Sequence, residues 1–264
     1  MRLPSFFCPK FKCDLIRLGQ KNDGGYSIPK ESLKNSDVVY GFGLGDDWSF
    51  EKDFQKLSGA KIICFDGNVN FRFWFIRFCK DLIDLVLLNK KSLEDYKRFI
   101  TYFNYRSFFK KKNAIHEEKN IAPINQYNHE ENKSKITDLN QILTKEEHFN
   151  FFLKIDIESQ EYRILDQIIK HQKGLTGLVI EFHECDLHFE KIKKFINEFE
   201  LQLVHIHVNN YGIVNEFGIP TVIELTFSPQ IYNTDRDENN NVFPVSGLDQ
   251  PNNKLKKDEL VVFE

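Results

Sequence analysis

Short apolar runs alternate along the chain with longer segments of helical periodicity. Each run is rich in Val, Ile, Leu and Phe and has the length of a strand, and amphipathic segments fit between most of the runs. This alternation predicts a largely parallel sheet with helices on both faces. The expected strands are Val38–Phe42, Lys61–Asp66, Lys111–Ile115, Phe151–Ile157, Gly177–Phe182, Leu201–Val208 and Thr221–Phe227, and the expected helices are Trp48–Leu57, Phe71–Leu88, Ser92–Phe103, Glu161–His171 and Leu187–Phe199.

The remaining segments are more polar. Asn125–Ser134 has the composition of a loop, and Thr234–Lys257 is rich in Asn, Asp and Pro, which predicts an irregular excursion. Glu259–Phe263 then offers a short closing strand. A chain of 264 residues is expected to form one α/β domain. That domain covers 1–264, with an N-terminal extension over 1–36 and an irregular C-terminal excursion over 228–264.

Near the carboxyl ends of several expected strands, every second residue is polar. Strands buried on both faces normally read as continuous apolar runs, and period-two geometry places residues of one parity on a common side. Ligands of open α/β sheets lie just beyond these ends. Burying ionisable groups there is costly unless they are paired or face a polar cleft, so the pattern predicts a catalytic cleft. The residues concerned are Lys154, Asp156 and Glu158, then Glu181 and His183, then His205, His207 and Asn209.

The first expected strand runs directly into a glycine-rich turn. Gly41, Gly43 and Gly45 lead into Asp46 and a segment able to start a helix. Glycine allows tight turns and close approach of main chain to a ligand, and a following helix directs free N–H groups to the same place. Asp66 ends the next strand roughly 20 residues further on, where nucleotide-binding folds hold a ribose hydroxyl. A nucleoside-containing cofactor is therefore expected; the alternatives are a turn without a ligand and a helix-capping role for Asp66.

Composition and charge narrow the class of protein. Hydrophobic residues make up 41% of the chain, and 26 phenylalanines against one methionine predict a rigid aromatic core. A net charge of −3 gives no electrostatic reason to bind nucleic acid or a membrane surface. The five cysteines lack CxxC spacing and no cleavable leader is visible, so reduced thiols and a cytoplasmic location are expected.

The aromatic segment 71–84 raises the question of a membrane span. It is too short, and too often interrupted by Arg72, Arg77, Lys80 and Asp81, to cross a bilayer. The sequence therefore predicts an amphipathic helix that covers the sheet, and no integral membrane segment.

Several of these segments resemble the FkbM-type S-adenosylmethionine-dependent methyltransferases. Arg17–Tyr26 is similar to the DGGY element of that family. Phe152–Glu161 is similar to its strongest signature, Lys-x-Asp-x-Glu-Gly-x-Glu, except that Ser159-Gln160 replaces the common Gly-Ala. This difference affects the turn after the strand, and with it the substrate side of the site. The glycine turn, Phe65-Asp66, Asn113–Ile115, Ile136–Leu143, Val204–Asn210 and Leu248–Asn252 extend the resemblance over most of the chain.

The resemblance implies a Rossmann-like seven-stranded methyltransferase sheet, mostly parallel with the last strand antiparallel, and S-adenosylmethionine as cofactor. Asp66 would bind the ribose hydroxyls through charge-assisted hydrogen bonds, and Asp156 would lie near the sulfonium. The other implied cofactor contacts are Asn22, Asp23, Gly25 and Tyr26 at the methionine end, Gly41, Gly43, Leu44, Gly45 and Asp46 along the glycine turn, and Asn113 and Ala114 beside the adenine.

For catalysis, Asp156 and Glu158 are expected to position the acceptor, and His183, His205 and His207 are the candidate general bases, because histidine titrates near neutral pH. Salt bridges and helix capping are the structural alternatives for the two carboxylates. Asp156, Glu181, His183 and His207 could also hold a divalent metal. Their spacing matches no compact metal motif, so no metal is predicted.

By resemblance, the acceptor is a sugar hydroxyl, including one on a nucleotide-linked sugar, and the reaction is O-methylation in the biosynthesis of a surface polysaccharide or other glycan. Nucleic acid is not expected as a partner, and the oligomeric state is left open. A nicotinamide-dependent dehydrogenase is one alternative, although Asp46 occupies the place of the third glycine of its motif. A non-catalytic, methyltransferase-like binding module is another, because of the altered Ser159-Gln160.

Overall fold

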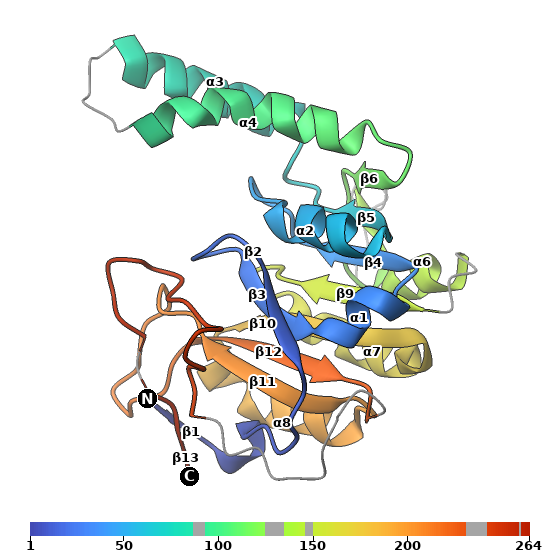
Figure 1. Ribbon diagram of the computed structural model, residues 1–264, viewed down its shortest axis with the longest axis vertical. Helices are drawn as coiled ribbons and strands as arrows, with labels where there is room; N and C mark the ends of the chain where they lie inside the picture. The colour runs from blue at the N-terminus through green and yellow to red at the C-terminus, as the bar shows by residue number, and fades with distance from the viewer. Residues whose placement is uncertain (87–92, 125–134, 146–149, 231–241, 259) are drawn as a thin grey trace.

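A seven-stranded sheet forms the centre of the computed structural model, which describes residues 1–86, 93–124, 135–145, 150–230, 242–258 and 260–264 (Figure 1). Numbered along the chain, the seven strands lie in the order 3-2-1-4-5-7-6. The last of them, β12, runs antiparallel to both of its neighbours, and the other pairings are parallel. The predicted fold class is therefore confirmed. The strands are β4 (Val38–Phe42), β5 (Lys61–Phe65), β6 (Ala114–Glu117), β9 (Phe151–Ile155), β10 (Leu175–His183), β11 (Gln202–Val208) and β12 (Val222–Ser228).

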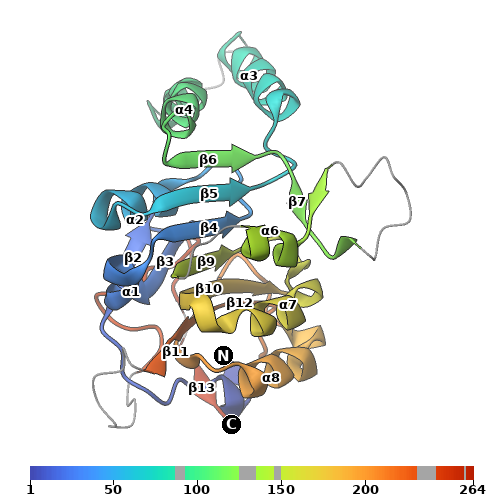
Figure 2. The same ribbon diagram turned by 90° about the vertical axis from the view of Figure 1, so that its right-hand side faces the viewer.

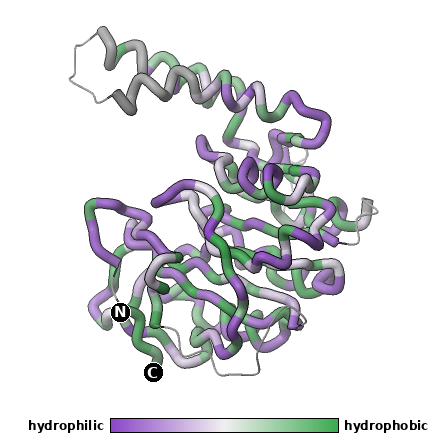
Figure 3. Tube along the Cα trace, in the orientation of Figure 1, coloured by the Kyte–Doolittle hydropathy of each residue, from purple (hydrophilic) through white to green (hydrophobic). Residues whose placement is uncertain are grey.

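Helices cover both faces of the sheet (Figure 2). Alternate residues of each strand enter separate cores, because successive side chains of a strand point to opposite faces. Leu153 packs in a core with Ile168 and Phe195, whereas its neighbour Phe152 packs against Phe54. In Figure 3 hydrophobic positions run through these central strands. The first core includes α6 (Leu139–Lys145), α7 (Leu165–Lys170) and α8 (Phe189–Glu198), and the second face carries α1 (Lys30–Asn35), α2 (Ser49–Ser58) and the hairpin of β2 (Leu15–Gly19) and β3 (Gly25–Pro29).

The alternate polar residues predicted from the sequence lie on the sheet face that carries the β2–β3 hairpin. Glu181 pairs with Glu224 across β10 and β12, and Glu224 pairs with His207 across β12 and β11. Two residues before His207 on β11, His205 pairs with Thr226 of β12. Cross-strand neighbours share a face, so the polar side chains of three strands form one continuous band beneath the hairpin.

Two helices, α3 (Phe71–Val86) and α4 (Leu93–Phe109), form a hairpin that projects from one end of the molecule (Figure 1). The expectation that α3 covers the sheet is wrong for most of its length. Phe71 and Phe75 are 76% and 56% exposed, and among the α3 side chains that the structure describes only Trp74 is buried, against Tyr102 and Tyr105 of α4. Among the described residues, no helix is both long and apolar enough to cross a membrane. The end of the predicted helix, 87–88, lies outside the described residues.

The chain ends are built into the structure. The predicted extension 1–36 contains the β2–β3 hairpin, and β1 (Arg2–Leu3) pairs in parallel with β13 (Val262–Phe263) rather than joining the main sheet. Residues 242–258 have no strand or helix, yet Phe243 and Asn252 are buried. The predicted loop 125–134 and residues 231–241 of the predicted excursion lie outside the described residues.

Smaller elements complete the description. The predicted helix 161–171 is interrupted at Ile164, which separates a 3-10 turn from α7. Strand β6 begins at Ala114, three residues later than the expected strand Lys111–Ile115. The short strands β7 (Asn120–Ile121) and β8 (Ile136–Thr137) pair in parallel, and the 3-10 turns are η1 (Ser5–Phe7), η3 (Glu161–Arg163), η4 (Gln172–Gly174) and η5 (Cys185–Leu187).

The packing of α2 on the sheet predicts a large cost for Phe152→Ala. Phe152 is fully buried, and its ring centroid lies 5.2 Å from that of Phe54. Removing the ring leaves a cavity, so the free energy of unfolding measured in urea should fall by about 3–5 kcal/mol. The control Phe103→Ala removes an exposed ring and should change it by less than about 0.5 kcal/mol. Equal losses in the two variants would contradict this core.

Candidate functional site

A cavity of about 390 Å³ opens at the carboxyl ends of β4 and β5. Its volume lies within the usual range of small-molecule sites, about 300–1,000 Å³. Of the residues predicted from the sequence, the structure brings together here Asp23, Tyr26, Gly43, Leu44, Gly45, Asp46, Asp66, Asp156 and Glu158.

A second cavity of about 520 Å³ adjoins the first and shares Asp66, Asp156 and Glu158 with it. Its far wall includes Asn120 and Ala122, which follow β6 along the chain. The sequence did not indicate these residues because the expected strand Lys111–Ile115 ended two residues before β6 does. The signal that could have found them is a strand read to Glu117, since ligands lie beyond strand ends.

The carboxylate of Asp66 connects the turns that follow β4 and β5. Its Oδ2 accepts hydrogen bonds from the N–H groups of Leu44 and Gly45, each at 3.0 Å. Its Oδ1 accepts from Asn68 at 2.8 Å and from Val69 at 3.3 Å. Asp66 therefore serves as the predicted cap of the segment after it and also stands at the wall of both cavities. These four N–H donors occupy the roughly four lone-pair sites of the carboxylate, so a ligand hydroxyl would share an oxygen with them or displace one of them.

Gly43 is the glycine on which this turn depends. Its φ is +81°, and a Cβ there would collide with the carbonyl oxygen of Asp156. The missing side chain lets the turn after β4 lie directly against the end of β9. Lys154 fixes the same junction, because its Nζ donates to the Gly43 carbonyl oxygen at 2.6 Å.

Some of the predicted cofactor contacts are not brought to either cavity, as far as the described residues show. Asn113 and Ala114 lie at the amino end of β6, opposite the edge where β5 ends, so their position does not support the predicted adenine contact. Asn22 instead donates to the Pro251 carbonyl oxygen. Gly25 lies inside the β2–β3 hairpin and Gly41 packs beneath Glu51 of α2.

Tyr26, Lys154 and Asp156 form a buried polar junction in the wall of the first cavity. The Tyr26 hydroxyl donates to Asp156 Oδ2 at 3.0 Å and lies 3.2 Å from Glu181 Oε2. Burial, together with these carboxylates, raises the pKa of Tyr26 well above its usual value, so the hydroxyl remains a donor. Lys154 Nζ lies 3.5 Å from Asp156 Oδ2 and over the Tyr26 ring. Glu51, which the sequence did not single out, also lines this cavity, and burial raises its pKa to about 7.

His183 stands among carboxylates at the end of β10. Its Nδ1 lies 2.7 Å from Glu161 Oε1, and its Nε2 lies 3.6 Å from both Glu158 Oε2 and Glu181 Oε1. Burial lowers the pKa of His183, but the Glu161 hydrogen bond and the neighbouring carboxylates outweigh it and raise this pKa to about 9. The imidazole is then already protonated at neutral pH, so in this state it is not the predicted general base.

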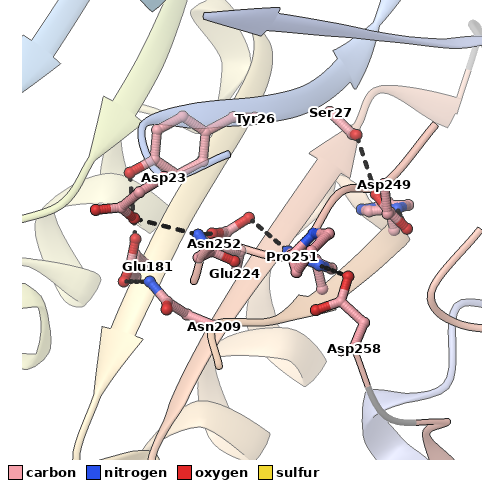
Figure 4. A network of polar contacts seen from close by, with 12 residues as sticks. Asp23, Tyr26, Ser27, Glu181, Asn209, Glu224, Asp249, Pro251, Asn252 and Asp258 are labelled. Atoms are coloured by element: carbon pink, nitrogen blue, oxygen red, sulfur yellow. Dashed lines mark hydrogen bonds and ion pairs between the residues drawn. The ribbon is translucent and has the colours of Figure 1, made fainter. Parts of the chain in front are cut away.

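His205 and His207 pair with carboxylates of the C-terminal segment and line neither cavity. Figure 4 shows two of these carboxylates, Asp249 and Asp258. Each ring is only 2% exposed. His205 Nε2 lies 3.1 Å from Asp249 Oδ2, and both nitrogens of His207 are engaged, with Glu224 at 3.3 Å and Asp258 at 3.2 Å. Their predicted role as general bases is therefore not supported, because neither ring has access to a substrate and both nitrogens of His207 are occupied.

The turn after β9 has a left-handed backbone at two residues that are not glycine. Glu158 and Ser159 have φ values of +53° and +69°. Ser159 thus adopts a conformation that a glycine would adopt without strain. The same conformation carries the Glu158 side chain into the wall shared by the two cavities.

No protein-family model matches the chain, and no curated protein matches it. Among solved structures, the chain is similar to an rRNA methylase from Streptococcus thermophilus, with 12% identity over 76% of this chain and 92% of that chain and a TM-score of 0.37. It is also similar to precorrin-6y C5,15-methyltransferase from Geobacter metallireducens (12%, 75% and 84%, TM-score 0.35) and to M. jannaschii TYW2 in complex with AdoMet (13%, 76% and 74%, TM-score 0.33). At such values the likeness says nothing about individual residues.

The left-handed turn predicts that Ser159→Gly stabilises the protein. The strain of about 1–2 kcal/mol for a left-handed non-glycine residue exceeds the extra unfolded-state entropy of glycine, about 0.4–1 kcal/mol. The free energy of unfolding in urea should therefore rise by about 0.5 kcal/mol. The control Ser107→Gly, at an exposed position in α4, should lower it by about 0.5–1 kcal/mol. A similar loss in both variants would show that the turn is not strained.

The buried His207 predicts a pH-dependent contribution to stability. Burial lowers its pKa, but hydrogen bonds to Asp258 and Glu224 outweigh this effect and raise the pKa to about 10. The folded protein then holds a proton that the unfolded chain releases near pH 6.5. Its contribution is therefore complete below about pH 6.5 and is lost as the pH rises toward 10.

Urea unfolding of the wild type and His207→Gln between pH 7 and 10 checks this: the difference in unfolding free energy should shrink as the pH rises. For the control His171→Gln the difference should stay constant, because burial lowers the pKa of His171 and leaves it neutral throughout this range. A His207→Gln difference that does not change with pH would contradict the charged, paired state of His207.

Proposed function

We propose that this protein is an S-adenosylmethionine-dependent methyltransferase. The observation that carries the proposal is the placement of Asp66 beside the Gly43–Gly45 turn, at the wall of a cavity beyond the ends of two adjacent parallel strands. Nucleoside cofactors of open α/β sheets are bound at this edge by close main chain on one side and a ribose-binding carboxylate on the other.

The charge of the first cavity supports an orientation for the cofactor. Asp156 and Glu158 lie at the end of β9, and Glu181 lies behind them. A positively charged sulfonium would be favoured on this side. Asp66 would then receive the ribose hydroxyls, and the adenine would extend toward Asn120 and Ala122 in the second cavity.

We further propose that the acceptor is a sugar hydroxyl, on the basis of the resemblance to FkbM-type enzymes over the 152–161 signature and the DGGY-like element. A hydroxyl is a weak nucleophile and gains from a base within hydrogen-bond reach. Asp156 and Glu158 are better placed for this than the buried histidines, since both line the shared wall of the cavities. In-line approach of the oxygen to the methyl group makes positioning a large part of the rate enhancement.

Calorimetry with S-adenosylhomocysteine tests the cofactor. A folded sample is expected to bind it at one site, and absence of binding would remove the proposal. Binding of a nicotinamide dinucleotide instead would favour a dehydrogenase. Asp46, which forms an ion pair with Arg77 where that motif needs its third glycine, argues against this outcome.

The variant Asp66→Asn identifies the ribose contact. Loss of charge-assisted hydrogen bonds worth about 1.5–3 kcal/mol should weaken S-adenosylhomocysteine binding by about 10- to 100-fold. The control Asp166→Asn, at an exposed position of α7, should bind as the wild type does. Thermal melting of both variants shows whether the fold is retained, and unchanged affinity in a folded Asp66→Asn sample would place the ribose elsewhere.

A further inference from the structure

Three side chains from the ends of two neighbouring strands converge on one point. Asp156 and Glu158 follow β9, and His183 ends β10. Each offers one ligand atom, and these atoms lie within 4.8 Å of one another. His183 Nε2 lies 3.6 Å from Glu158 Oε2 and 3.9 Å from Asp156 Oδ1. These separations are too long for hydrogen bonds. Two ligands bound at about 2.1 Å to one ion lie about 3.0–3.5 Å apart, which small side-chain movements would reach.

The imidazole of His183 is oriented from behind by a buried carboxylate. Glu161 is fully buried; its Oε1 lies 2.7 Å from Nδ1, and its Oε2 has no hydrogen-bond partner in the described part of the chain. With Nδ1 donating to Glu161, Nε2 faces the carboxylates, and within the described ranges no acceptor lies close enough to bond a proton there. A carboxylate that holds the far nitrogen of a histidine is the usual support of a metal-binding imidazole.

Hydrogen bonds also orient the carboxylates of Asp156 and Glu181. The Tyr26 hydroxyl donates to Asp156 Oδ2, which leaves Oδ1 as the oxygen nearer His183. Glu181 lies behind them; it accepts a hydrogen bond from Asn209, and its Oε2 lies 3.2 Å from the Tyr26 hydroxyl oxygen. Hydrogen bonds thus hold Asp156, Glu181 and His183 in place, whereas the exposed Glu158 side chain has none among the described residues.

The charge of this cluster also calls for a cation. Four carboxylates surround His183, namely Asp156, Glu158, Glu161 and Glu181, of which Glu181 has a pKa raised well above its usual range by burial. The cations beside them are the protonated ring of His183 itself and Lys154, which lies 3.5 Å from Asp156 on the side of the glycine turn. Carboxylates placed close together with too few counter-charges are costly, and a bound divalent ion is the largest local charge that can offset them.

We propose that Asp156, Glu158 and His183 bind a divalent metal ion in the wall shared by the two cavities. Two carboxylates and one imidazole, with positions left for water or substrate, suit a first-row ion such as Mn²⁺. On binding, the ion takes the place of any proton on Nε2. Glu158, whose side chain is 87% exposed, would close over the ion from the solvent side.

The role of the ion in catalysis rests on the proposed function, whereas its binding does not. An acceptor hydroxyl that coordinates the ion becomes more acidic. With Asp156 and Glu158 bound to the ion, solvent water takes the place of these carboxylates as the base. The O–H bond breaks with the proton passing to that water, the oxygen forms a bond to the methyl carbon, and the methyl–sulfur bond breaks with the electron pair remaining on sulfur. The ion would favour an acceptor that offers a hydroxyl with a second oxygen beside it, as sugars do.

Titration of chelator-treated full-length protein with Mn²⁺, followed by calorimetry and by the electron paramagnetic resonance signal of free Mn²⁺, tests the site. One bound ion is expected. Glu158→Gln and His183→Asn should each weaken its binding at least tenfold, and the control Glu190→Gln, at an exposed position of α8, should bind as the wild type does. No binding by the wild type, or equal binding by all three variants, would overturn the proposal. Glu158→Gln keeps the test informative if His183→Asn fails to fold.

A parallel titration with S-adenosylhomocysteine separates this proposal from the proposed function. Cofactor binding without Mn²⁺ binding would overturn the metal site and leave the methyltransferase intact. Mn²⁺ binding that depends on Glu158 and His183, without cofactor binding, would support the metal site and remove the methyltransferase.

Discussion

The carboxylate of Asp66 is the interaction on which the geometry of the cavities depends. It accepts hydrogen bonds from four main-chain N–H groups in two turns that are separated by a helix and a strand. Those turns form one end of the candidate site, and the close contact of Gly43 with Asp156 attaches the end of β9 to them. One buried charge, satisfied by main chain, thus sets the spacing of three strand ends and leaves room for a ligand between them.

The sheet face that carries α2 and the β2–β3 hairpin is apolar in one part and polar in another. Near α2 it carries the aromatic cluster of Phe50, Phe54 and Phe152. Toward β12 and β11 it carries Glu224 and the histidines, which are buried and are contacted by residues 242–258, while the β2–β3 hairpin bonds to β12 beside them. Figure 4 shows Glu224 among Asp249, Asn252 and Asp258 of that segment. Because both segments bring their own polar partners, the charged band is buried at its outer end, and only the part near β9 and β10 borders the cavities.

Period-two alternation and the glycine turn carried most of the prediction. They indicated the sheet, the common side of the polar residues and a ligand site at the carboxyl ends of the strands, whereas the place of Asp156 beside that ligand came from the family resemblance. They could not separate His183, beside the cavities, from His207, which is buried. Both follow the same parity, and the difference comes from Asp258, more than fifty residues away in a segment that has no periodic pattern. The same limit explains α3: its aromatic residues matched a covering helix, but the helix leaves the sheet after Trp74.

The sequence by itself determined the order of strands and helices, the glycine turn and the carboxylate 21 residues after it, because these depend on local periodicity and on contacts between consecutive strand ends. Only the tertiary structure decided which polar side chains stay accessible. That outcome depends on where the N-terminal hairpin and the irregular C-terminal segment pack, and on which buried charges they neutralise. Such long-range pairings leave no local signal, because a buried histidine and one beside a cavity occupy equivalent positions along their strands.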